Sequence, residues 1–200
     1  MPRSLILGLT FAIAAAFAPE VAFAHVGVGA TSGFARGFWH PIGGLDHVLA
    51  MVAVGMFAAN LGGRALWAVP LTFVAVMAFG GLLGIEHVAI PYVEIGIAVS
   101  VIVLGLVVAL QVQWPVAAAM ALVAVFAIFH GHAHGEEMPL DASGATYAAG
   151  FMLATALLHI VGIAIGIGIQ RIGSSYWHRT AQFAGVAMAI AGVGLLTGVL

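Results

Sequence analysis

Cysteine is absent from the 200-residue chain, and this absence excludes every site that depends on a thiol. The protein can have neither a disulfide framework nor an iron–sulfur cluster, and thiols say nothing about its redox compartment. A metal ion bound to this chain is therefore expected to have nitrogen and oxygen ligands. The eight methionines are scattered along the apolar runs, and we interpret them as packing residues rather than as a relay for Cu(I).

Charged residues are scarce as well. They make up 6% of the chain, lysine is missing, and the five basic residues are isolated arginines. Soluble domains contain roughly 25% charged residues, so the 64% hydrophobic content predicts an integral membrane protein. A net charge of −2 gives no indication of nucleic-acid binding. Without lysine there is no G-x-x-x-x-G-K-[ST] loop, so this chain is not expected to hydrolyse ATP.

The first 24 residues have the pattern of a secretory signal peptide. Arg3 precedes a short apolar core over residues 5–17, and Ala22-Phe23-Ala24 is an A-x-A cleavage site. We predict that cleavage after Ala24 makes His25 the new N-terminus, outside the cytoplasm. The alternative is an uncleaved seventh helix.

Six apolar runs follow that are long enough to cross a hydrocarbon core of about 30 Å. They lie near residues 43–60, 65–84, 89–110, 114–131, 145–169 and 180–199. We therefore predict an all-α polytopic membrane protein: after removal of residues 1–24, residues 25–200 form one transporter domain, a compact six-helix bundle with both termini outside. The pairs Gly80/Gly84 and Gly162/Gly166 predict close helix packing.

The arginines support this orientation. With the mature N-terminus outside, the inward loops contain Arg64, Arg171 and Arg179, and only Arg36 remains outside. This distribution agrees with the positive-inside rule.

Two imidazoles and a carboxylate open the first run, in the stretch HPIGGLDH (residues 40–47). On a straight helix His40 and His47 would lie about 10 Å apart along the axis, too far to share one ion. Pro41 and the glycines after it favour a non-helical entry, which would let His40 approach Asp46 and His47. Asp46 is either a ligand itself or a hydrogen-bond partner that orients an imidazole.

A second group of polar residues is FHGHAHGEE (residues 129–137). His130 and His134 have the i, i+4 spacing by which a helix presents two imidazoles to one metal ion, and Glu137 continues that face. His132 and Glu136 point elsewhere, and we expect them to collect ions in a loop. The alternative for the whole stretch is a solvated histidine-rich loop.

Four further ionisable residues need separate interpretations. Glu94 is expected one turn inside the membrane, as a metal ligand, a proton carrier or the partner of a histidine. His159 is either a deeper relay site or a ring bonded to a backbone carbonyl. His87 and His178 are interpreted as ordinary interfacial histidines.

Imidazole and carboxylate ligands suit Ni(II), Co(II) or Zn(II), and Cu(II) is also compatible. Ligands gathered at the outer mouth of a bundle suggest capture and then inward passage, by a channel, by coupling to an ion gradient or by trapping inside. If His25 is the N-terminus, its α-amine and imidazole form a bidentate chelator, and we predict that it contributes to the outer site. Unchanged metal binding after insertion of one alanine between Ala24 and His25 would refute this.

The two motifs resemble those of the HupE/UreJ family of nickel and cobalt permeases. HPIGGLDH matches H-x5-DH, and FHGHAHGEE matches FHG-x-[AV]-HG-x-E, each in the helix where the family has it. The resemblance implies a secondary nickel transporter of the bacterial inner membrane that supplies hydrogenase or urease maturation proteins. Its motif positions are occupied by His40, Asp46, His47, His130, His134 and Glu137, and Glu94 resembles the family's acidic residue in the third helix. The metal ion is then a substrate, and no resident cofactor is expected.

Two other functions compete with transport. A membrane-embedded zinc-dependent hydrolase could use the same His/Asp/Glu cluster, provided that an open coordination position faces a substrate cavity. A haem electron carrier would need histidines paired at two depths, whereas these are crowded at one end. We therefore expect a permease and not an enzyme.

Overall fold

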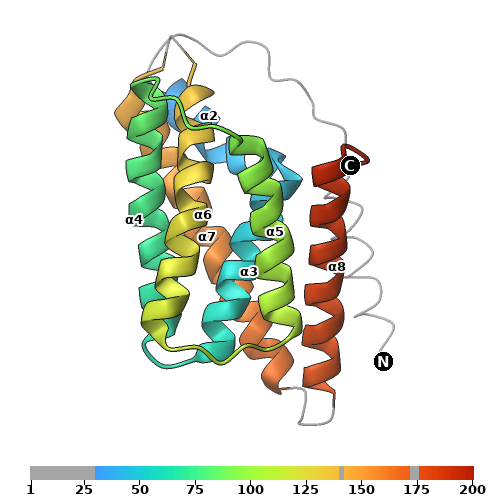
Figure 1. Cartoon of the computed structure of the whole chain (residues 1–200). Helices are drawn as coiled ribbons and strands as arrows, with labels where there is room; N and C mark the ends of the chain where they lie inside the picture. The colour runs from blue at the N-terminus through green and yellow to red at the C-terminus, as the bar shows by residue number, and fades with distance from the viewer. Residues whose placement is uncertain (1–29, 140–141, 172–175) are drawn as a thin grey trace, which may run out of the picture.

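The computed structural model describes residues 30–139, 142–171 and 176–200 (Figure 1). The predicted signal peptide and His25 lie outside the described residues. The described part of the chain is all-helical, as predicted. Its helices are α2 (Ala30–Gly43), α3 (Leu45–Leu61), α4 (Ala65–Ile85), α5 (Val93–Ala109), α6 (Val116–Glu136), α7 (Gly144–Arg171) and α8 (Trp177–Thr197).

Each predicted apolar run overlaps one of the helices α3 to α8. Four described helices are long and apolar enough to cross a membrane, namely α4, α6, α7 and the part of α8 over His178–Thr197. The bent pair of α2 and α3 is a fifth if it counts as one span. With 17 residues, α5 is apolar but shorter, rising about 26 Å. The protein is thus a multi-pass helical membrane protein, whereas the number of six spans stays a prediction.

The expected non-helical entry to the first run is wrong. His40 and Pro41 lie inside α2, and α2 meets α3 at a bend of 80°. Only Gly44, with extended backbone angles, separates the two helices. A Cβ atom at Gly44 would lie 2.7 Å from Asp46 Oδ1 and 3.0 Å from His47 Nδ1. A residue with a side chain at this position would displace the ends of the Asp46 and His47 side chains, which fold back over Gly44.

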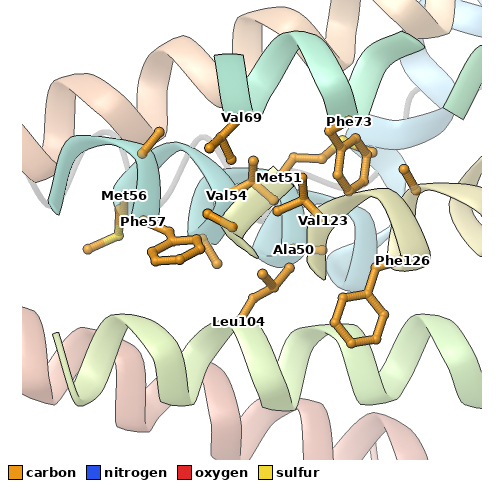
Figure 2. Packing of buried hydrophobic residues seen from close by; sticks show 14 of the residues in the cluster. Ala50, Met51, Val54, Met56, Phe57, Val69, Phe73, Leu104, Val123 and Phe126 are labelled. Carbon is orange, nitrogen blue, oxygen red and sulfur yellow. The ribbon is translucent and has the colours of Figure 1, made fainter. Parts of the chain in front are cut away.

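The hydrophobic core surrounds α3, which lies in the middle of the bundle (Figures 1 and 2). Side chains of α3, α4, α5 and α6 meet there, and Figure 2 shows Met51, Val54, Phe57, Phe73, Leu104 and Val123 among them. Most of these side chains are completely buried. α3 therefore holds His47 in place, because the turns that follow this residue are packed against the neighbouring helices.

Glycines bring α4 and α6 into backbone contact. A Cβ atom on Gly131 would lie 2.0 Å from the carbonyl oxygen of Met77, and one on Gly84 would lie 2.3 Å from that of His132. A Cβ atom on Gly162 would likewise lie 2.2 Å from the carbonyl oxygen of Val52 in α3. The close packing predicted from the glycine pairs is confirmed, and on α6 it fixes the part of the helix that carries the histidines.

α6 is longer than the sequence suggests. The apolar run ends near residue 131, but the helix continues to Glu136, and residues 130–135 are all buried. The alternative of a solvated histidine-rich loop is therefore wrong, because these residues form the buried C-terminal end of a helix.

The polar residues gather at one end of the bundle, which we call the histidine end. It contains α2, the N-terminal ends of α5 and α7 and the C-terminal end of α6 (Figure 1). The connection from α3 to α4 and the facing ends of α7 and α8 lie at the opposite end, with Arg64, Arg171 and Arg179.

Candidate metal centre

Four histidine rings from three helices meet at the histidine end. His47 of α3 lies 4.9 Å from His130 and 4.7 Å from His134 of α6, measured between ring centroids. His40 of α2 lies 4.9 Å from His134 and 6.1 Å from His47. The 80° bend between α2 and α3 produces the approach of His40 to His47 that a straight helix would prevent. The structure thus brings both motifs together in one cluster.

Asp46 determines which nitrogen of His47 can bind a metal ion. The Oδ1 atom of Asp46 lies 2.8 Å from His47 Nδ1, and it also accepts the backbone N–H of His47. Because a carboxylate oxygen is an acceptor, Nδ1 carries the proton and Nε2 has the free lone pair. This Nε2 atom is buried and has no hydrogen-bond partner among the described residues. The arrangement is that of a metal-binding histidine held by a carboxylate.

Glu137 has the same relation to His40. Its Oε2 atom lies 2.8 Å from His40 Nε2, so the proton of this ring is on Nε2 and the lone pair on Nδ1. The hydrogen bond with His40 lowers the pKa of the Glu137 carboxyl below its usual range. Glu137 therefore stays ionised and adds a negative charge beside the cluster.

Ser100 of α5 orients His130 and was missed in the sequence. Its hydroxyl donates to the carbonyl of Ile97 at 2.6 Å, so it accepts the Nε2–H of His130 at 2.9 Å. The lone pair of His130 is then on Nδ1, which is buried without a partner in the described structure. In the sequence, the only feature that could have indicated this role is that Ser100 is a polar residue within an apolar run. No neighbouring residue in the sequence connects it with the histidines.

His134 is fully buried, and its ring stacks on Phe151 of α7 at 4.8 Å. Neither of its nitrogens has a hydrogen-bond partner among the described residues. Buried imidazole nitrogens without partners are unfavourable unless a ligand occupies them. Together with His47 Nε2 and His130 Nδ1, they form a set of nitrogen donors that suits a late first-row divalent ion.

A cavity of about 600 Å³ opens beside this cluster. It is lined by residues of α2, α3, α5, α6 and α7 and of the segment after α6, including Arg36, His40, Asp46, His47, Glu94, Glu137 and Tyr147. Glu94 reaches it from the first turn of α5, a helix that begins at Val93 rather than near residue 89, and its side chain is exposed. The cavity therefore adds three carboxylates and the guanidinium group of Arg36 to the histidines.

The donors do not yet surround a common point. In the described part of the chain, no three His, Asp or Glu side chains are placed so that they could hold a metal ion as they stand. In the pairs Asp46–His47 and His40–Glu137, each carboxylate is already engaged with its imidazole. Binding of one ion by several of these groups therefore requires rotation of side chains.

The remaining histidines lie apart from this cluster. His132 is buried, its Nε2 lies 2.7 Å from the carbonyl of Val88, and its Nδ1 lies 3.5 Å from Glu136. The expectation that His132 collects ions in a loop is wrong, because helix packing has given this ring another partner. His87 is exposed, and His178 contacts Gln111 at the opposite end.

His159 is buried in α7, and neither of its ring nitrogens has a hydrogen-bond partner among the described residues. The alternative of a bond to a backbone carbonyl is therefore not seen.

The comparisons with known proteins agree with the two motifs. A family model described as "HupE / UreJ protein" matches residues 13–195. Protein HupE of Rhizobium leguminosarum bv. viciae is 48% identical over 190 residues, which are 95% of this chain and 97% of that protein. No solved structure matches the chain. The extent of both matches shows that the chain belongs to the HupE/UreJ family.

Proposed function

We propose that the protein is a secondary transporter that takes up a divalent transition metal ion, Ni(II), from the periplasm into the cytoplasm. Membership of the HupE/UreJ family supports a nickel or cobalt permease role at the level of the family. In this proposal the protein resides in the inner membrane and supplies nickel to hydrogenase or urease maturation. Co(II) and Zn(II) are the competing substrates that the same ligands would accept.

One observation carries the proposal: the ring of His47 is held by Asp46, its Nε2 atom has no partner among the described residues, and the ring lies within 4.9 Å of the buried rings of His130 and His134. A packing role does not explain three adjacent buried imidazoles that each have at least one ring nitrogen without a hydrogen-bond partner among the described residues. The cavity beside them is lined by Asp46, Glu94 and Glu137 and by one guanidinium, that of Arg36, so a hydrated cation meets an entrance of net negative charge. We assign capture to the cavity and dehydration to the histidines behind it.

The direction of transport follows from the arginines. The end of the bundle opposite the histidines carries Arg64, Arg171 and Arg179, and the positive-inside rule would place that end in the cytoplasm. The histidine end would then face the periplasm. His25 would lie on the same side after signal cleavage and remains a proposed additional ligand.

Reconstituted liposomes with a nickel-sensitive dye inside test this function. We expect Ni(II) entry in the wild type and a loss of roughly 10- to 100-fold or more in His47→Ala and His134→Ala, as for altered metal sites. His87→Asn is the matched control, because His87 is an exposed histidine with a left-handed backbone (φ 53°) that asparagine tolerates. Tight, static metal binding without flux would instead favour the hydrolase.

A further inference from the structure

His159 is a buried titratable residue that the metal centre does not use. It lies on α7 with 1% of its surface exposed, and both ring nitrogens lack partners among the described residues. An ionisable side chain inside a membrane bundle is energetically unfavourable unless it is paired, and such residues usually belong to a functional site. The two unpaired ring nitrogens therefore indicate that His159 binds a ligand that is separate from the metal centre.

Two other donors lie beside this ring. Phe73 and Met77 are one turn apart on α4, and they face His159 and Thr155, which are one turn apart on α7. The rings of Phe73 and His159 lie 5.1 Å apart, and the Thr155 hydroxyl donates to the Met77 sulfur at 3.6 Å. Thr155 and His159 share one face of their helix. An imidazole, a thioether and a hydroxyl thus lie within about one helical turn, and all three side chains are buried.

These residues lie on a line between the two ends of the bundle. Phe73 points into the centre of the bundle (Figure 2), and its ring contacts both His159 and His130, the latter at 5.6 Å. Along α7, Tyr147 lines the cavity at the histidine end, and Gly166 lines a small cavity at the opposite end with Met56 and Asn60. His159 lies between the two.

We propose that His159, Met77 and Thr155 form a transit site for a late first-row divalent metal ion midway through the bundle. The inference rests on the proposed transport function and adds a second metal-binding site to the transport path. Imidazole and thioether are ligands for such ions and poor ligands for Mg²⁺ or Mn²⁺. The carboxylates of the described residues lie at the histidine end, so an ion at His159 has no charge to hold it. Occupancy would then be brief, as passage requires.

The first test compares flux with binding. In liposomes, His159→Gln should lower the initial rate of Ni(II) entry about tenfold or more, since even the loss of a ligand's hydrogen-bond partner costs a metal site roughly 10- to 100-fold. The Ni(II) affinity of the purified protein should stay unchanged, because the outer centre is intact. Met77→Leu conserves volume and should reduce the preference for Ni(II) over Mn(II). Met188→Leu on α8 is the control, a partly buried methionine packed against the core.

Unchanged flux in His159→Gln would overturn the transit site. Parallel loss of flux and affinity would also overturn it, because His159 would then act through the structure of the outer centre.

A second readout does not depend on transport. In the full-length variant in which His40, His47, His130 and His134 are all replaced by alanine, residual Co(II) binding should give visible absorption bands that disappear when His159→Gln is added. Persistent bands would refute the site. If the wild type transports no nickel, the proposed function falls, and the Co(II) spectrum still decides whether His159 binds metal.

Discussion

At the scale of single residues, the metal centre depends on which nitrogen of each ring carries the proton. Asp46, Glu137 and Ser100 each fix one imidazole by a hydrogen bond and leave its other nitrogen free. Two of these partners were in the sequence motifs, but their roles were open, because a carboxylate beside a histidine can bind either the metal or the ring. The contact between Asp46 and His47 makes orientation the role that the geometry supports.

Substitution of Asp46 by asparagine separates the two roles. Asp46→Asn removes the charge that keeps the His47 proton on Nδ1, and loss of such a partner typically weakens metal binding about 10- to 100-fold. We expect this weakening by equilibrium dialysis with Ni(II), while X-ray absorption shows the same number of imidazole ligands. Glu86→Gln, an exposed carboxylate between α4 and α5, should leave binding unchanged. Loss of one oxygen ligand from the spectrum would instead identify Asp46 as a direct ligand.

At the scale of helices, the sequence predicted the apolar elements well and the polar ends poorly. The runs at α4 and α7 matched within about two residues, because hydropathy and length identify helices that face lipid. α2, the bend at Gly44 and the last turn of α6 were missed. Hydropathy assigns a stretch such as GHAHGE to a loop, and its burial depends on glycines of α4 that lie some fifty residues earlier in the chain. Packing against other helices therefore determines where the polar end of such a helix lies and how deeply it is buried.

The contact between α4 and α6 allows a test at this scale. Gly131→Ala places a Cβ atom 2.0 Å from the Met77 carbonyl, so the helices must separate, at a cost of about 1–3 kcal/mol. We expect a lower midpoint of thermal unfolding in detergent and weaker Ni(II) binding, because Gly131 lies between His130 and His134 of the metal centre.

Gly168→Ala on α7 is the control for this substitution. It also replaces a helical glycine, but the added methyl group meets nothing within 4 Å. Alanine is the better helix former by up to about 1 kcal/mol, so this variant should be as stable as the wild type or slightly more so. A Gly131→Ala protein with unchanged unfolding and binding would show that α4 and α6 can repack without the glycine contact.

At the scale of the whole molecule, two polar layers enclose an apolar bundle. Most of the described histidines and the described Asp and Glu carboxylates lie at one end together with Arg36, and Arg64, Arg171 and Arg179 lie at the other together with His178. The proposed capture, transit and release follow this axis, so the direction of transport depends on which end faces the periplasm. The absence of cysteine, which excluded thiolate sites, makes this orientation directly measurable.

A single cysteine introduced into this chain is the only thiol present. Ala89 and Gln113 are both exposed, the first in the connection from α4 to α5 at the histidine end, the second in the connection from α5 to α6 at the arginine end. If the histidine end faces the periplasm, a membrane-impermeant maleimide should label Ala89→Cys in intact spheroplasts and should label Gln113→Cys only after lysis. Both variants should retain nickel uptake, which shows that the labelled protein is folded. The reverse labelling pattern would place the metal centre in the cytoplasm and turn the proposed uptake into export, because the carboxylate-lined cavity would then collect ions from inside the cell.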